Sequence, residues 1–110
     1  MDKAVDHIAR PSFLMAEANA YAVFVVGTSM EPRFNTGEIL YVDPSAPVRR
    51  GPDVVVQIND DGELRAVVKQ FKNADDKLVR VEQLNPRKEI TFDKNTVTAL
   101  HAVQGSWIRA

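Results

Sequence analysis

Two side chains in this sequence have the chemistry of a nucleophile and its base, Ser29 and Lys69. Ser29 stands in the heptapeptide Val-Gly-Thr-Ser-Met-Glu-Pro at residues 26–32, just after an apolar run that ends at Gly27. A serine nucleophile needs a rigid mount, a nearby base and N–H donors for the oxyanion. Gly27 permits close approach of the backbone, and Pro32 fixes the exit of the loop. The alternative is an ordinary turn, in which serine and threonine are common.

The sequence offers a lysine as the base. Residues 64–71 read Leu-Arg-Ala-Val-Val-Lys-Gln-Phe, and in a strand Lys69 shares one face with Val67 and Phe71. An amine on an apolar face is desolvated, which disfavours the ammonium form and lowers the pKa of the lysine. A neutral lysine can take a proton from a serine hydroxyl. The alternative is an edge-strand lysine whose ammonium reaches water.

Histidine and cysteine contribute less to this chemistry. The chain has no cysteine, which excludes disulfides, thiol catalysis and zinc ribbons. Its two histidines are His7, near the start, and His101, which lies within a predicted strand and is interpreted as a structural or interface residue. Two histidines argue against a multi-histidine metal site, and a Ser-Lys pair requires no metal and no cofactor.

Other charged groups are interpreted as solvated. A glycosidase needs two carboxylates that converge across a sugar, whereas Asp60-Asp61 and Asp75-Asp76 are adjacent pairs within predicted turns. The pair Arg49-Arg50 precedes Gly51 and is typical of a solvated loop.

Short strands are the elements that must position Ser29 and Lys69. Residues 21–26 are apolar at every position, which fits a strand buried on both faces. Turn signals separate further strands, predicted over residues 38–42, 53–58, 64–71, 77–84, 89–92 and 97–103. Seven strands with almost no helix predict an all-β meander, sandwich or partly closed barrel.

The N-terminal segment has a different pattern. Apolar residues recur at helical spacing over residues 3–9 and stop before Pro11, which predicts a short helix. Residues 12–20 are mixed and rich in alanine, as in an irregular arm.

Length and charge limit the classes of protein. At 110 residues the chain is expected to form one domain. Its 14 basic and 15 acidic residues give a formal charge of −1, without the basic excess that binding to phosphates requires. No stretch approaches the roughly 18 apolar residues of a membrane span, and the start lacks the apolar core of a secretory signal. We therefore expect a cytoplasmic protein that does not insert into a membrane.

The order of these motifs resembles the LexA, phage-repressor and UmuD family of self-cleaving Ser-Lys peptidases. The heptapeptide at residues 26–32 is followed by Gly37-Glu38 at the start of a strand, by Gly51 before an apolar strand, and by Val68-Lys69. Ser29 and Lys69 are 40 positions apart, which suits that family. Leu-Asn-Pro at residues 84–86 and the segment 99–105 also look like its C-terminal half, so the resemblance covers about residues 20–106.

The resemblance implies a role for each residue of the motif. Ser29 would be the nucleophile and Lys69 the general base. The backbone N–H groups of Thr28 and Ser29 would hold the oxyanion, and Met30 would pack beneath the site. The implied fold is that of LexA and signal peptidase, with twisted antiparallel sheets in a partly open barrel. Residues 20–110 would be the peptidase and dimerisation domain, and residues 1–19 an arm or a remnant of the linker and cleavage region.

The resemblance also implies partners. The family's domain forms homodimers through its C-terminal strands, here around residues 97–108, where Trp107 either contributes to the contact or covers an edge of the core. The substrate would be a peptide bond in the same or a sibling chain, cut autocatalytically in the SOS response with a RecA filament as a possible trigger. DNA would be bound only by an N-terminal helix-turn-helix, and the 28 residues before Ser29 are too few for one. We thus expect either an excised C-terminal domain or a stand-alone UmuD-like protein.

One departure from the family keeps alternatives open. Family members cut themselves at Ala-Gly or Cys-Gly, and neither dipeptide occurs in this sequence, where Gly27 follows Val26. The alternative is a non-cleaving dimerisation and sensing domain of a transcription regulator. A signal-peptidase-like enzyme shares the Ser-Lys logic and is a more remote alternative, because that family uses a membrane anchor.

Overall fold

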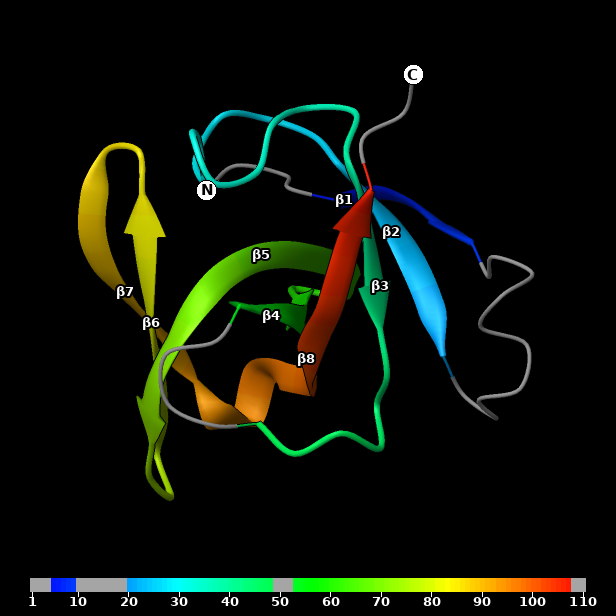
Figure 1. The fold of residues 1–110 in the computed structure, drawn as a ribbon. Helices are drawn as coiled ribbons and strands as arrows, with labels where there is room; N and C mark the ends of the chain where they lie inside the picture. The colour runs from blue at the N-terminus through cyan, green and yellow to red at the C-terminus, as the bar shows by residue number, and fades with distance from the viewer. Residues whose placement is uncertain (1–4, 10–19, 49–52, 108–110) are drawn as a thin grey trace.

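The computed structural model describes residues 5–9, 20–48 and 53–107, and in them eight strands form one antiparallel sheet (Figure 1). The order of the strands across the sheet is β1-β2-β3-β8-β4-β5-β6-β7. Their bounds are β1 Val5–Ala9, β2 Tyr21–Val25, β3 Ile39–Val42, β4 Asp53–Asp60, β5 Glu63–Ala74, β6 Leu78–Leu84, β7 Arg87–Asp93 and β8 Val97–Trp107, with one 3-10 turn, η2, at Lys94–Thr96.

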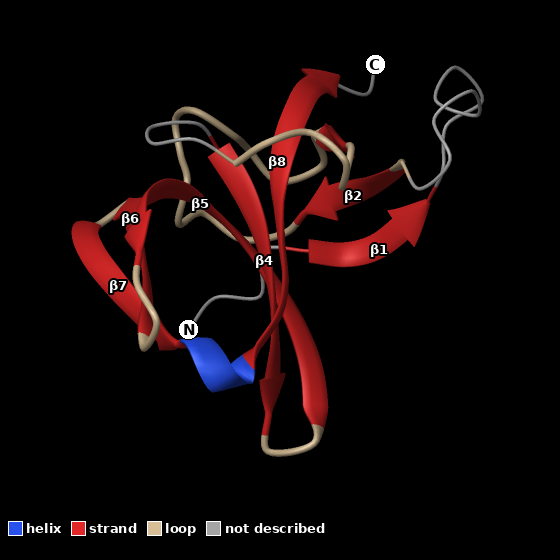
Figure 2. Cartoon of the chain, turned by 90° about the horizontal axis from the view of Figure 1, so that it is seen from below, coloured by secondary structure: helices blue, strands red, loops and turns tan. Residues whose placement is uncertain are grey.

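The sheet is curled, so that its ends bend toward each other around a shared core (Figure 2). β1 is an edge strand that pairs with β2, yet it also approaches β5 from across the curl. This half-barrel confirms the predicted all-β fold with little helix. Among the described residues, no helix has the length and hydropathy to cross a membrane.

The core explains why several strands are apolar without alternation. In β4 the consecutive residues Val54, Val55 and Val56 are all fully buried, which requires cover on both faces of the sheet. One face packs into the main core, which extends from β2 to β7. A smaller cluster of Ala22, Ile39 and Tyr41 lies apart from it on β2 and β3. β2 covers residues 21–25 of the strand predicted over 21–26, and it contributes buried residues to both clusters, Val23 to the main core and Ala22 to the smaller one.

The predicted helix over residues 3–9 is wrong, because residues 5–9 form strand β1. β1 pairs antiparallel with β2, with Val5 opposite Val25 and Ala9 opposite Ala22. Spacing of apolar residues along a short segment does not separate helix from strand, and here pairing with an existing strand determines the outcome. β1 lies inside the segment assigned to an N-terminal arm, while residues 10–19 of that arm and Arg49, Arg50 and Gly51 lie outside the described residues.

Four strands are longer than their turn signals predicted, and one of them is β4, which ends at Asp60 rather than at residue 58. β5 continues beyond residue 71 because Asn73 and Ala74 still pair with β6, so the predicted turn at residues 73–76 begins later. β8 continues to Trp107 because its last residues pair with β3. β7 begins at residue 87, and a two-residue turn joins it to β6. The hairpin predicted between residues 58 and 64 is confirmed, with positive φ at Asp61 and Gly62 as a tight primed turn requires.

Candidate active site

Ser29 lies in the loop between β2 and β3, residues 26–38, called here the Ser29 loop. The loop is closed at its base, because the Val25 N–H donates to the Glu38 carbonyl and the Gly37 N–H donates to the Val25 carbonyl, each at 2.9 Å. The Thr36 hydroxyl accepts from the Gly27 N–H at 3.1 Å and donates to the Gly27 carbonyl at 2.9 Å. Gly27 has a φ of 99°, a conformation that favours glycine. These bonds hold the start of the loop in one shape.

Two further sets of contacts hold the Ser29 loop in place, one to the main core and one to the start of β4. Met30 and Phe34 are buried and belong to the main core, so they attach the loop to the sheet. Arg33 forms a two-pronged ion pair with Asp53 at the start of β4, with Nε donating to Oδ1 at 3.0 Å and Nη2 lying 2.7 Å from Oδ2. Planar pairs of this kind fix orientation as well as distance. No local pattern in the sequence matches Arg33 to Asp53, which are 20 positions apart.

Lys69 lies in the middle of β5 and reaches the serine. Its Nζ donates to Ser29 Oγ at 3.0 Å. Lys69 has no exposed surface and Ser29 is 2% exposed, so the two groups meet inside the protein. On β5 the neighbours Val67 and Val68 are buried as well, and across the ladder Lys69 pairs with Val54 of β4. The structure therefore brings together the two residues that the sequence singled out.

The turn between β6 and β7 contacts the backbone on either side of the serine hydroxyl. The Ser29 carbonyl accepts from the N–H of Leu84 at 3.1 Å and from the N–H of Asn85 at 2.8 Å. The side-chain amide of Asn85 donates to the Thr28 carbonyl at 3.1 Å. Figure 1 shows this turn, in yellow, beside the Ser29 loop, in cyan. The sequence predicts residues 84–86 only as a strand end and as part of the resemblance, because contacts to main-chain carbonyls leave no compositional signal.

The backbone around Ser29 has donors available for a developing negative charge. Among the described residues, neither the Thr28 N–H nor the Ser29 N–H donates a hydrogen bond to another group. These are the two groups that the resemblance implied as the oxyanion hole. Thr28 is exposed, whereas Ser29 is buried. Free N–H groups beside a hydroxyl are what an acyl-transfer site needs.

His101 is not at this site. The Tyr21 hydroxyl lies 2.7 Å from His101 Nδ1, and Gln57 Nε2 donates to the Tyr21 hydroxyl at 3.2 Å. Burial raises the pKa of the Tyr21 phenol and lowers the pKa of His101. Both pKa shifts favour the neutral forms, in which the Tyr21 hydroxyl can donate to the unprotonated Nδ1 of His101. This contact fits the structural role expected of His101. Nothing is assigned to the side chain of His7, which lies on β1.

The acidic pairs lie away from the serine. Asp60 and Asp61 are exposed, and Asp60 pairs with Arg65. Asp75 caps the turn before β6 by accepting from the N–H groups of Lys77 and Leu78, and these bonds and its contact with Arg80 lower the pKa of Asp75 to about 2. Among the described residues, no group of three or more His, Asp or Glu side chains could hold a metal ion.

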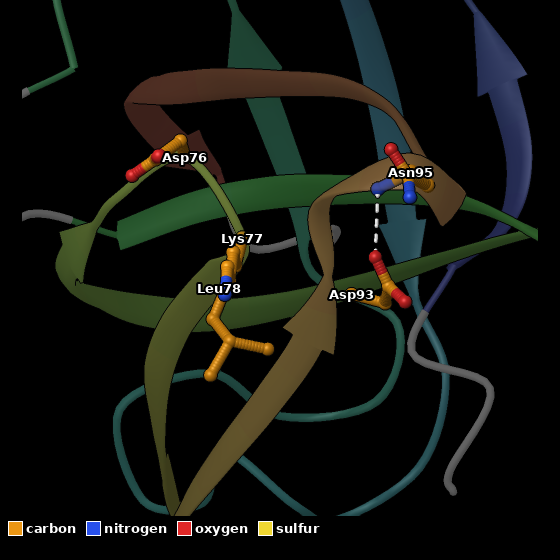
Figure 3. Close-up of a pocket in the computed structure, with 5 residues that line it drawn as sticks. All are labelled: Asp76, Lys77, Leu78, Asp93 and Asn95. Carbon is orange, nitrogen blue, oxygen red and sulfur yellow. Dashed lines mark hydrogen bonds between the residues drawn. The ribbon is translucent and has the colours of Figure 1, made fainter.

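A surface pocket of about 500 Å³ lies beside the turn that precedes β6 (Figure 3). Its lining comprises Asp76, Lys77, Leu78, Asp93 and Asn95, and the Asn95 N–H donates to Asp93 Oδ1 at 3.0 Å. Leu78 begins β6, whereas Leu84, at its other end, contacts the Ser29 carbonyl. Seven residues of strand separate the two ends by about 20 Å. The pocket is therefore distinct from the Ser29–Lys69 pair.

Comparisons with known proteins agree with this geometry. Residues 1–105 match the family of Peptidase S24-like proteins. The chain is 39% identical over 104 residues to the "Repressor protein C" of Rhizobium phage 16-3, a match that covers 90% of this chain and 40% of the repressor. The chain thus spans about two fifths of the length of that relative. No solved structure gives a significant match. The resemblance to LexA and phage repressors is confirmed, and the chain belongs to the Peptidase S24-like family.

Proposed function

We propose that this domain is a serine endopeptidase of the Ser-Lys type, which cuts a peptide bond in its own chain or in a sibling chain of a transcriptional repressor. The observation that carries the proposal is the buried hydrogen bond of 3.0 Å between Lys69 Nζ and Ser29 Oγ. A nucleophile and a base within hydrogen-bond reach are the geometric requirement for covalent catalysis. Complete burial of the amine disfavours its charged form, which suits a base.

The proposed reaction follows from these positions. The neutral Lys69 amine takes the proton of the Ser29 hydroxyl while Oγ bonds to the carbonyl carbon of the scissile peptide. The carbonyl oxygen becomes an oxyanion, which the N–H groups of Thr28 and Ser29 stabilise. The C–N bond then breaks, and the Lys69 ammonium returns its proton to the leaving nitrogen. Water, deprotonated by the same amine, hydrolyses the acyl-enzyme ester and restores Ser29.

The substrate is proposed to be a segment of the repressor itself, as in the family. Neither Ala-Gly nor Cys-Gly occurs in this sequence, so the proposal names no scissile bond. DNA binding is proposed to reside in a further domain of the repressor, in line with the formal charge of −1 of this one. A RecA filament is proposed as the trigger, and the cytoplasm as the compartment.

Self-cleavage of the longest native form of the chain tests the proposal. We expect fragments to accumulate faster as the pH rises from about 7 to about 10, since Lys69 must be neutral. Ser29→Ala and Lys69→Ala should each abolish the cut, whereas the matched changes Ser45→Ala and Lys77→Ala, at exposed positions, should not. Mass spectrometry would map the cut, with and without RecA filament. Cleavage at the same rate in Ser29→Ala would overturn the assignment of the nucleophile.

Dimerisation is a second proposed activity, and one observation favours it. Trp107, the last residue of β8, is 57% exposed, so it does not cover an edge of the core. An exposed tryptophan is a frequent anchor of protein interfaces. We propose that the end of β8 meets a second copy of the domain. If cleavage has been lost, the domain would act through this contact alone, as a sensing and dimerisation module.

A further inference from the structure

We propose that Asn85 is a positioning residue whose side-chain amide fixes the direction of the Ser29 N–H, the donor proposed for the oxyanion. The inference deepens the proposed function and rests on it for its chemical meaning. It starts from the contact of Asn85 Nδ2 with the Thr28 carbonyl oxygen at 3.1 Å. Asn85 belongs to the turn between β6 and β7, 56 positions after Ser29 in the chain.

The geometry of the peptide group links that contact to the oxyanion. The Thr28 carbonyl and the Ser29 N–H belong to one planar trans peptide, so they point in opposite directions. A bond that holds the carbonyl oxygen on one side therefore aims the N–H at the other side. The carbonyl also accepts from the Glu31 N–H at 3.1 Å. Asn85 thus adds a second donor, and one that comes from a different part of the fold.

The same turn holds the next peptide by its backbone. The Ser29 carbonyl accepts from the N–H groups of Leu84 and Asn85, which aims the Met30 N–H in the same way. These backbone bonds do not depend on the side chain at position 85. Asn85→Ala therefore removes one contact, the bond to the Thr28 carbonyl, and leaves the turn attached to the Ser29 loop.

A buried glutamine keeps the turn in place. Gln83 is 6% exposed, and its Nε2 donates to the carbonyls of Asn85 at 3.3 Å and Pro86 at 3.1 Å. A buried amide with both acceptors supplied by one turn restricts that turn to one conformation. Gln83 therefore holds the turn, the turn holds the Asn85 amide against the Thr28 carbonyl, and that carbonyl sets the direction of the Ser29 N–H.

The direct test measures the direction of the N–H bond. Residual dipolar couplings of the backbone amides are recorded for the wild-type chain, Asn85→Ala, Asn85→Asp and the control Asn73→Ala. Asn85→Asp keeps the shape but has no N–H donor at neutral pH, and Asn73 is an exposed asparagine on β5 that contacts Arg80. Relative to the wild type, we expect the Ser29 coupling to change in both Asn85 variants and to stay the same in Asn73→Ala. The couplings of β4 and β5 should stay the same in all four proteins. An unchanged Ser29 coupling in both Asn85 variants would overturn the inference.

The rate at which Ser29 reacts with a covalent probe tests whether Asn85 matters for the chemistry. An alkyl fluorophosphonate, which phosphonylates activated serines, is reacted with the same four proteins over a range of pH. We expect Asn85→Ala to react on the order of tenfold more slowly, because a misdirected oxyanion donor stabilises the transition state less, with the midpoint of the pH profile unchanged because Lys69 is untouched. Labelling at the wild-type rate in both Asn85 variants would contradict the inference. If wild type itself is not labelled, the proposed function fails, and the dipolar couplings still decide whether Asn85 directs the Ser29 N–H.

Discussion

Lys69 has the largest fully buried side chain in the part of the chain that the structure describes. Burying an amine costs free energy, and a hydrogen bond such as the one to Ser29 offsets that cost only in part. A methionine, which is unbranched and of similar length, would fill much of the same space in β5 without that cost. The lysine is therefore placed at the expense of stability, as is usual for groups kept for chemistry.

This view predicts the effect of replacing the amine by an apolar group. Lys69→Met should leave the free energy of unfolding unchanged or raise it by up to about 4 kcal/mol, and should remove all chemistry at Ser29. Urea unfolding at neutral pH measures the first effect. Lys72→Met is the matched control on the same strand, because Lys72 is a surface partner of Glu89, and its effect should stay within about 0.5 kcal/mol. A large loss of stability in Lys69→Met would show that the amine is structural.

His101 gives a second prediction at the residue scale, because burial lowers the pKa of its imidazole from 6.5. As the pH falls through about 6.5, the unfolded chain takes up the proton before the folded one does. The free energy of unfolding should therefore decrease as the pH is lowered from about 7.5 to about 5.5. Urea unfolding should show a weaker dependence on pH in His101→Gln. An equal dependence in both proteins would mean that His101 does not carry this effect.

At the scale of elements, the strands form a rigid frame around the Ser29–Lys69 pair. The Ser29 loop spans the gap between β2 and β3, and β5 brings Lys69 to it from the other half of the sheet, with β8 and β4 between them. No local segment contains both residues. The pair therefore exists only when the whole sheet has formed, and a weakened β3 should weaken the site as well as the fold.

Two leucines provide a matched test of this frame. Leu40 in β3 is fully buried, whereas Leu64 in β5 is 73% exposed. We expect Leu40→Ala to lower the free energy of unfolding by about 2–5 kcal/mol, and Leu64→Ala to change it by less than about 0.5 kcal/mol. Thermal or urea unfolding of both variants measures the difference. Similar losses in the two variants would contradict the placement of β3 in the core.

Prediction from the sequence worked where the signals are local. Apolar runs located β2 and β4, and the Asp61-Gly62 turn located the hairpin between β4 and β5. It failed for β1, whose conformation depends on pairing with β2 rather than on its own spacing. It also missed the Arg33–Asp53 ion pair and the contacts of Asn85, because these join segments far apart in the chain. Ser29 and Lys69 could be matched only through a family resemblance, for the same reason.

At the scale of the whole molecule, the eight strands and the Ser29–Lys69 pair form one domain of the Peptidase S24-like family. The chain spans 40% of the phage repressor that it resembles, and its formal charge of −1 does not favour binding to a phosphate backbone by itself. We propose that its contribution to the repressor is cleavage and dimer formation.

Dimer formation is testable through the exposed end of β8. We expect the domain to self-associate at micromolar concentration, and Trp107→Ala to weaken the association by tenfold or more, as the loss of an interface anchor does. Leu64→Ala is the control, since Leu64 is the other large apolar side chain with high exposure among the described residues. Sedimentation equilibrium measures both. A strictly monomeric wild-type domain at high concentration would rule out this contact.

The central claim is that Lys69 activates Ser29, and labelling of the 110-residue chain with the alkyl fluorophosphonate tests it most directly. We predict one covalent adduct, mapped by mass spectrometry to Ser29, whose rate of formation rises from about pH 6 to about pH 10 as the amine becomes neutral. Lys69→Met and Ser29→Ala should give no adduct at that position, and Lys72→Met should react like the wild type. Equal labelling of Ser29 in Lys69→Met and wild type, or no labelling of the wild type at any pH, would contradict the account.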